Sequence, residues 1–353
     1  MSAAAPAPAP LDGEHRGAAA HSRWSLPLGR IGGIEVRVHA SFAVLVALVL
    51  LTSGQVKGGA PAALLWLALI FACVLLHELA HCAVARRRGV AVSEILLLPI
   101  GGLSRMERLP EVARDEFAIA VVGPLSSFGL ALLAGLAAVS RGDELLPPTL
   151  VVGAMPTRLF WFNLLLGAFN LLPAFPLDGG RVLRALLETR LDLEQATHRA
   201  ARLGRLVAVL LVVVGVLVNL WLILIGVFVY LGAAAEEAAT VLHVRLAGRR
   251  VADLMHPAPP QLAGTALDPR EAWWIEADDP VNEEVLERLG HAPRHAMLAV
   301  REGRVIGVVS RGDLQHLLDQ PPEREGASTH APLPPPPPPR TTSRQIWRHR
   351  HGR

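Results

Sequence analysis

The chain has 353 residues, of which 52% are hydrophobic and 18% are charged, and its mean hydropathy is +0.38. Soluble domains carry about 25% charged residues, so this composition argues against an ordinary soluble enzyme, and two cysteines in so long a chain exclude a disulfide scaffold. The net charge of +3 shows no large basic surplus, so we expect no nucleic-acid partner. The composition indicates an integral membrane protein with a soluble appendage.

Both ends of the chain have compositions that do not support a packed core. Residues 1–23 are rich in Ala and Pro, and residues 320–353 contain six consecutive prolines followed by a basic His/Arg segment. Segments of this kind bury too little apolar surface to fold. We therefore expect two disordered tails, the second acting as a spacer.

Five charge-free apolar runs lie between the tails, at residues 40–56, 58–76, 117–140, 159–177 and 206–235. A membrane-spanning helix needs about 20 apolar residues, so each of the first four runs predicts one span. The fifth run would reach roughly 45 Å as a single helix, which is too long for one untilted span. Because Asn219 lies near its middle, we expect a helical hairpin there whose first arm begins near Gln195.

The placement of arginine predicts which side of the membrane each connection occupies. Basic residues concentrate before the first run, between the second and third, between the fourth and fifth, and after the last. By the positive-inside rule these segments are cytoplasmic, which requires an even number of spans. We predict six spans in the inner (plasma) membrane with both termini in the cytoplasm; five spans are the alternative.

The second run continues into the sequence LLHELAH at residues 75–81, which carries the HExxH pattern. His77 and His81 are four residues apart, so their imidazoles project from one face of a helix, with Glu78 beside them. In this pattern the imidazoles bind zinc and the glutamate takes a proton from the metal-bound water. The alternative is a pair of interfacial histidines with Glu78 turned toward the arginines at 86–88. Ionisable residues in an apolar membrane helix are costly and favour the functional interpretation.

A catalytic zinc needs a third protein ligand and one open position. Residues 82–88 lack the further histidine of the HExxHxxGxxH pattern. Asp178 follows the fourth run, and the predicted topology places it near the cytoplasmic leaflet, at the same depth as His77 and His81. We therefore expect one Zn²⁺ per chain, held by these three residues.

Residues around Asp178 have further expected roles. Pro173 and Pro176 should break the helix, and Gly179 and Gly180 should let the chain turn sharply and approach the metal. Asn170 is expected either to donate a hydrogen bond to a developing oxyanion or to brace the unwound segment.

Five other residues receive structural interpretations. Gly123 and Ser127 predict a small-residue face for helix packing. Cys73 and Cys82 lie on opposite faces of one expected helix, so they should not form a disulfide bond with each other. His39 is expected to be an interfacial histidine rather than a fourth metal ligand.

HELAH on one span and N-x-x-P-x-x-P-L-D-G-G on a later one resemble the site-2 protease family of intramembrane zinc metalloproteases. The resemblance covers about residues 30–240 and rests on these positions: His77, Glu78, His81, Asn170, Pro173, Pro176 and Asp178. It implies cleavage of a membrane-spanning protein substrate within or near its transmembrane helix. In bacteria such substrates are typically anti-sigma factors, other membrane-held regulators or signal-peptide remnants.

Residues 89–102 predict a small β-element close to HELAH. Residues 90–98 favour strand, while Pro99, Gly101 and Gly102 favour a turn. The family resemblance implies that this element inserts into the membrane near the active site. An extended substrate could then pair with its edge, or the segment could simply be a loop that covers the cavity.

Residues 249–318 regain the composition of a soluble domain and resemble a cystathionine-β-synthase (CBS) domain, through VADLM and GVVSRGDL. Two strands are expected around a turn at Glu302 and Gly303. Gly307, Ser310 and Asp313 match that family's nucleotide-contacting pattern, which implies an adenosine nucleotide as ligand. Only one copy is recognisable, so the alternative is a structural module that pairs with a second chain in a homodimer.

The sequence thus predicts an all-α polytopic membrane protein with a small membrane-associated β-element over residues 24–240, and a small cytoplasmic α/β CBS-like domain. The predicted activity is that of a zinc metalloendopeptidase in which Glu78 activates the zinc-bound water. A catalytically inactive scaffold and a metal transporter are the alternatives. A transporter would carry polar residues on several spans, and an inactive scaffold would be expected to lose a ligand or Glu78.

Overall fold

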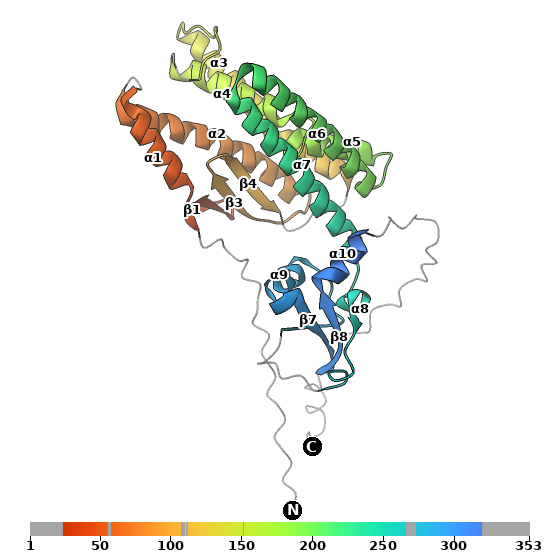
Figure 1. Ribbon diagram of the computed structural model, residues 1–353. Coiled ribbons are helices and arrows are strands. Elements are labelled where there is room, and N and C mark those ends of the chain that lie inside the picture. Colours follow the sequence, from red (N-terminus) through yellow and green to blue (C-terminus); the bar gives the residue numbers. More distant parts are fainter. Residues whose placement is uncertain are drawn as a thin grey trace, which may run out of the picture. The chain divides into compact units, whose positions relative to one another are not determined.

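The computed structural model describes residues 24–55, 58–106, 110, 112–150, 152–265 and 273–319. The chain divides into two compact units between Ala247 and Gly248 (Figure 1). The tails expected at residues 1–23 and 320–353 lie outside the described residues.

A four-stranded sheet lies beside the helices of the first unit. Its strands, in the order β1-β2-β3-β4, are β1 (Ser25–Ile31), β2 (Ile34–His39), β3 (Val92–Leu98) and β4 (Gly101–Met106). The outer pairs β1–β2 and β3–β4 are antiparallel, and β2 runs parallel to β3. The sheet exceeds the element expected at residues 89–102. Gly101 and Gly102 belong to β4 rather than to the turn, which falls at Pro99 and Ile100.

The two faces of this sheet differ in polarity because neighbouring residues of a strand point to opposite sides. Val36 and Ile95 are paired in register and pack against Val74 of the second helix. On the other face the carboxylate of Glu94 lies between two guanidinium groups, 3.8 Å from that of Arg37 and 3.2 Å from that of Arg105. The apolar face therefore holds the sheet against the helix that carries HELAH.

The helices of the first unit are α1 (Phe42–Thr52), η1 (Ser53–Gln55), α2 (Gly59–Arg87), α3 (Ala113–Ser140), α4 (Met155–Asn170), α5 (Asp178–Glu188), α6 (Leu193–Val218) and α7 (Leu220–Leu246). By length and composition, four helices in the described part of the chain can cross a membrane: α2, α3, α6 and α7. The first and fourth apolar runs form helices of 11 and 16 residues, shorter than a simple span. The count of six spans stays a prediction.

The fifth apolar run forms the expected hairpin. Helix α6 ends at Val218 and α7 begins at Leu220, while the side chain of Asn219 accepts a hydrogen bond from the backbone of Trp221 at 2.8 Å. The two helices are antiparallel, because Arg245 near the end of α7 pairs with Glu194 at the start of α6 at 2.8 Å. The first arm begins two residues before the expected Gln195.

The second unit contains a sheet of order β5-β8-β7-β6 and several short helices. Its elements are α8 (Val251–Leu254), β5 (His256–Pro257), β6 (Trp274–Glu276), α9 (Glu283–His291), η2 (Pro293–His295), β7 (Ala296–Arg301), β8 (Arg304–Ser310) and α10 (Arg311–Asp319). The hairpin expected around Glu302 and Gly303 is present, and both residues have the positive φ that a tight hairpin turn requires. The CBS-like assignment stays a prediction.

Candidate metal centre

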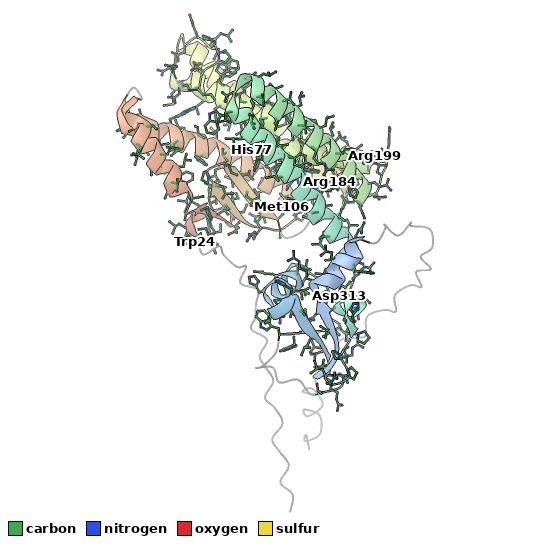
Figure 2. All side chains as sticks on the ribbon, in the orientation of Figure 1. Trp24, His77, Met106, Arg184, Arg199 and Asp313 are labelled. Atoms are coloured by element: carbon green, nitrogen blue, oxygen red, sulfur yellow. The ribbon has the colours of Figure 1, made fainter. Side chains whose placement is uncertain are left out.

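Three side chains from two distant segments converge inside the first unit. His77 and His81 lie on α2, and Asp178 is the first residue of α5. The Oδ2 atom of Asp178 lies 3.1 Å from Nε2 of His77 and 3.2 Å from Nε2 of His81. The two Nε2 atoms are 3.2 Å apart, so three potential ligand atoms form a nearly equilateral triangle. Figure 2 labels His77 among the helices of this unit.

The far side of each imidazole is held by a second hydrogen bond. Nδ1 of His81 lies 2.6 Å from the carbonyl oxygen of Ile119. A carbonyl oxygen can only accept, so Nδ1 carries the proton and Nε2 of the neutral ring offers a lone pair. Nδ1 of His77 lies 2.9 Å from the hydroxyl of Ser127, which can accept in the same way.

The donor set fits zinc. Zinc–nitrogen and zinc–oxygen bonds of about 2.0–2.2 Å in tetrahedral geometry put neighbouring ligand atoms roughly 3.3 Å apart, close to the separations in this triangle. Lone pairs and a carboxylate oxygen facing one another at this distance repel unless a metal ion or a ring proton lies between them. Two histidines and one carboxylate also match the ligand types of catalytic zinc sites, with a fourth position left for water.

Helix α3 lies directly against this triangle. A Cβ atom on Gly123 would lie 2.1 Å from Nε2 of His81 and 2.7 Å from Nε2 of His77. One turn further along α3, Ser127 contacts His77. Gly123 and Ser127 were expected only to let helices pack closely. In the structure both residues also contact the histidines. The sequence feature that could have predicted this contact is Ser127 itself, because a hydroxyl in the middle of an apolar run needs a hydrogen-bond partner.

The segment before Asp178 explains how its carboxylate reaches α2. Helix α4 ends at Asn170 and residues 171–177 are irregular, which confirms the break expected at Pro173 and Pro176. The following glycines let the chain pack tightly here. A Cβ on Gly179 would lie 2.2 Å from the carbonyl oxygen of Leu172, so the first turn of α5 packs on the irregular backbone. The expected approach of these glycines to the metal stays a prediction.

Other predicted residues have local partners. The amide nitrogen of Asn170 donates to the carbonyl oxygen of Leu166 at 2.9 Å, one turn back in α4. Nδ1 of His39 accepts a hydrogen bond from the backbone of Ser41 at 3.2 Å, at the start of α1. The described contacts of both residues therefore brace their own segments, and the oxyanion role of Asn170 stays a prediction. Cys73 and Cys82 are buried and free, as expected.

A buried ionic cluster, which the sequence does not reveal, anchors α5. The guanidinium of Arg184 is 1% exposed and donates to Glu116 of α3 and, at 3.0 Å, to Thr240 of α7. Glu236 of α7 lies 3.4 Å away. The cluster joins α3, α5 and α7, and Figure 2 labels Arg184 on α5. Because Asp178 begins the same helix, this anchor also fixes the position of the predicted third ligand.

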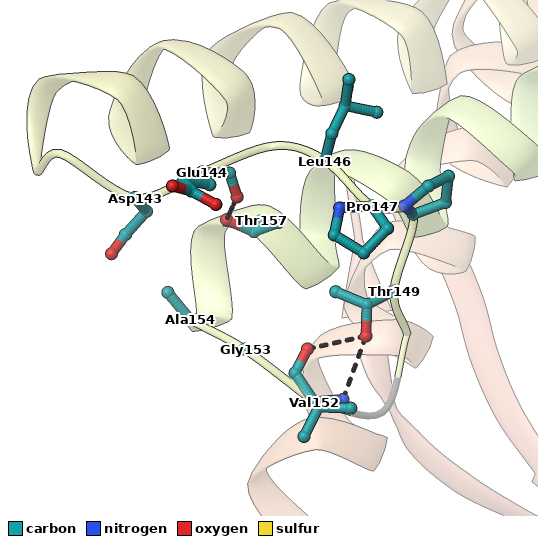
Figure 3. Close-up of a pocket in the computed structure, with 10 residues that line it drawn as sticks. Asp143, Glu144, Leu146, Pro147, Thr149, Val152, Gly153, Ala154 and Thr157 are labelled. Atoms are coloured by element: carbon teal, nitrogen blue, oxygen red, sulfur yellow. Dashed lines mark hydrogen bonds between the residues drawn. The ribbon is translucent and has the colours of Figure 1, made fainter.

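A hollow of about 460 Å³ lies elsewhere in the first unit, in the connection between α3 and α4 (Figure 3). Asp143, Glu144 and Thr157 line it together with a Pro-rich loop. Helix α3 ends at Ser140, 13 residues beyond Ser127 and roughly 20 Å further along the helix axis, and Asp143 follows that end. The hollow is therefore separate from the metal centre.

In the second unit, the predicted nucleotide contacts have partners of their own. The Asp313 carboxylate accepts hydrogen bonds from the backbone and hydroxyl of Ser310, at 2.7 and 2.8 Å, and pairs with His256 at 2.7 Å. Gly307 packs closely on Met255, whose sulfur would lie 2.5 Å from an added Cβ. These contacts stabilise the start of α10 and the edge of the sheet. Nucleotide binding stays a prediction.

The apolar helices and the His/His/Asp triangle together define a membrane metalloprotein. The sequence model of peptidase family M50 matches this chain over residues 65–151 and 149–215. It is 35% identical to Rip3 of Mycobacterium tuberculosis, named as a zinc metalloprotease, over 87% of this chain and 79% of that protein. It is 36% identical to the zinc metalloprotease MJ0392 of Methanocaldococcus jannaschii, over 67% of each. A solved structure, the site-2 protease from Methanocaldococcus jannaschii, superposes with a TM-score of 0.47 at 36% identity, over 61% of this chain and 95% of that one.

The chain belongs to peptidase family M50, the site-2 protease family. It is a zinc metalloendopeptidase and a membrane protein.

Proposed function

We propose that this metalloendopeptidase hydrolyses peptide bonds within or near the transmembrane segments of membrane-held regulators, anti-sigma factors among them. The observation that carries the proposal is that two of the three corners of the triangle lie on an apolar helix. His77 and His81 belong to α2, which is long and apolar enough to cross a bilayer. Both histidines are buried between α2 and α3. We infer that a substrate lying in the same membrane reaches this site.

His77, His81 and Asp178 would hold one zinc ion. When bound, zinc polarises the scissile carbonyl and makes a water molecule more acidic. Glu78 follows His77 directly and is half-buried beside the triangle. Its carboxylate accepts the proton of the attacking water and then delivers it to the leaving amine. Asn170 would donate to the developing oxyanion after its amide leaves the carbonyl of Leu166.

The free edge of β4 is the proposed binding site for the substrate. Among the described strands β4 pairs only with β3, so its outer backbone groups are available for another strand. Gly102 of β4 lies against Glu78, because an added Cβ would be 2.5 Å from Cγ of the glutamate. A segment paired with this edge would run close to the base. It would also be extended, and its peptide bonds would be free of the hydrogen bonds that shield them in a helix.

The membrane placement belongs to the same proposal. We place the protein in the inner membrane with both termini in the cytoplasm, because basic residues dominate the connections that the positive-inside rule assigns there. The second unit would then be cytoplasmic and regulatory. An adenosine nucleotide or a second copy of the chain would be its partner.

The test uses the full chain purified in detergent and a tagged transmembrane reporter. Wild type should cleave the reporter and contain about one zinc per chain. Glu78→Gln should keep the zinc and lose cleavage, because the substitution removes the base and leaves the ligands. Active wild type without zinc, or an active Glu78→Gln variant, would contradict the proposal.

A further inference from the structure

Strand β4 forms a wall along the face of α2 that carries Glu78. Alternate residues of a strand point to the same side, and three alternate residues of β4 contact α2 or its neighbours. Gly102 lies against Glu78, Ser104 bonds with Glu78 and Cys82, and Met106 packs with Ala85. This wall follows α2 for more than one turn, starting at Glu78.

The hydrogen bonds at the middle of this wall have a defined direction. The hydroxyl of Ser104 donates to Oε2 of Glu78, because an ionised carboxylate can only accept. The thiol of Cys82 lies 3.5 Å from the same hydroxyl and donates to it. The chain of donors therefore runs from Cys82 through Ser104 to Glu78. Cys82 is fully buried, so water does not replace this thiol as a partner of the serine.

Two contacts from one strand thus restrict the side chain of Glu78. Gly102 leaves room for its Cγ, and Ser104 holds one carboxylate oxygen. A glutamate on a helix otherwise samples several staggered rotamers. A general base works only within about 2.6–3.2 Å of the proton that it removes, so rotamers that turn the carboxylate away from the metal centre are inactive.

We propose that Ser104 is a positioning residue that holds the carboxylate of Glu78 in its reactive orientation. This inference rests on the proposed function, because it assigns Glu78 the role of base. Ser104 bonds with none of the three ligand side chains in the described contacts. Its contribution should therefore be to the rate of the chemical step and not to zinc binding or substrate affinity.

The experiment compares Ser104→Ala, Ser104→Thr and the control Ser93→Ala in the full-length protein. Ser93 lies on the neighbouring strand β3, where its hydroxyl donates to the carbonyl oxygen of Arg105 at 3.2 Å, away from Glu78. Bound zinc, kcat and KM are measured on the tagged reporter. We expect Ser104→Ala to lower kcat about 10- to 100-fold with KM and zinc content unchanged. Ser104→Thr should restore most of the rate, and Ser93→Ala should match wild type.

The outcomes separate this inference from the proposed function. Full activity of Ser104→Ala, together with an inactive Glu78→Gln variant, would overturn the role of Ser104 and leave the protease assignment intact. Loss of zinc in Ser104→Ala, or no rescue by threonine, would show a structural role and overturn the inference as well. An active Glu78→Gln variant would remove the proposed function itself.

Discussion

Nδ1 of His81 lies 2.6 Å from the carbonyl oxygen of Ile119, which joins helix α2 to helix α3 at the metal centre. The carbonyl fixes the proton on Nδ1 and turns the lone pair of Nε2 toward Asp178. The backbone of α3 therefore determines the tautomer of a predicted ligand on α2. Ser127, two turns further along α3, contacts His77 in the same manner.

Asp178→Ala should reduce bound zinc to well below one per chain. The carboxylate supplies one corner of the triangle, and two histidines alone do not complete a catalytic zinc site. Elemental analysis of the purified protein measures the loss. Asp143→Ala is the control, since that carboxylate lines the separate hollow and its removal should leave the zinc in place. Full zinc in Asp178→Ala would reject Asp178 as the third ligand.

Gly123→Ala should abolish cleavage and lower zinc content at least tenfold, because the new methyl group would overlap both Nε2 atoms. Gly129 lies on the same helix with no atom within 4 Å of an added Cβ, so Gly129→Ala is a matched control for helix propensity. Zinc analysis and reporter cleavage are measured together. Equal behaviour of the two variants would contradict the close contact of α3 with the site.

Ser127→Ala should weaken zinc binding by roughly 10- to 100-fold, which is the usual effect of removing the partner of a metal-bound histidine. The measurement is competition with a zinc chelator of known affinity. Ser140→Ala removes a hydroxyl whose described hydrogen bond stays within the last turn of α3, so it should not change the affinity. An unchanged affinity in Ser127→Ala would show that His77 does not need this partner.

Arg184→Met should destabilise the protein by about 3 kcal/mol or more, because it leaves Glu116 buried without its cation. Thermal or denaturant unfolding in detergent measures the change. The double variant Arg184→Met, Glu116→Gln should recover part of the loss, since it removes both buried charges. Arg190→Ala, at an exposed position just beyond α5, should have little effect. A stable Arg184→Met variant would mean that the ionic cluster is dispensable.

Removing the metal should abolish cleavage reversibly. A chelator strong enough to compete for zinc should inactivate the wild type, and added zinc should restore the rate. Far-UV circular dichroism before and after treatment checks that the helices remain folded. Activity that persists in metal-free protein would contradict zinc catalysis.

Local patterns were sufficient for several features of this protein. The HExxH spacing places His77 and His81 on one helix face whatever surrounds them. The apolar runs and Asn219 predicted the α6–α7 hairpin, and the two prolines predicted the break before Asp178. The sheet was underestimated because no strand was expected at residues 25–39, which precede the first apolar run directly. Strands β2 and β3 pair in parallel although α1 and α2 lie between them in the sequence. No pattern within a short stretch of sequence predicts such a pairing.

The sequence by itself was sufficient to predict the pair of histidine ligands, the role of Glu78 as base and the depth of Asp178, and to indicate the family to which the chain belongs. These features depend on helix periodicity, hydrophobic length and charge asymmetry, all of which are readable over short stretches. Only the tertiary structure decided which groups surround them. Ile119, Gly123 and Ser127 contact the histidines, and Ser104 contacts Glu78, because α3 and β4 pack against α2. Those contacts join residues 26 to 50 positions apart, and packing rather than spacing sets such distances.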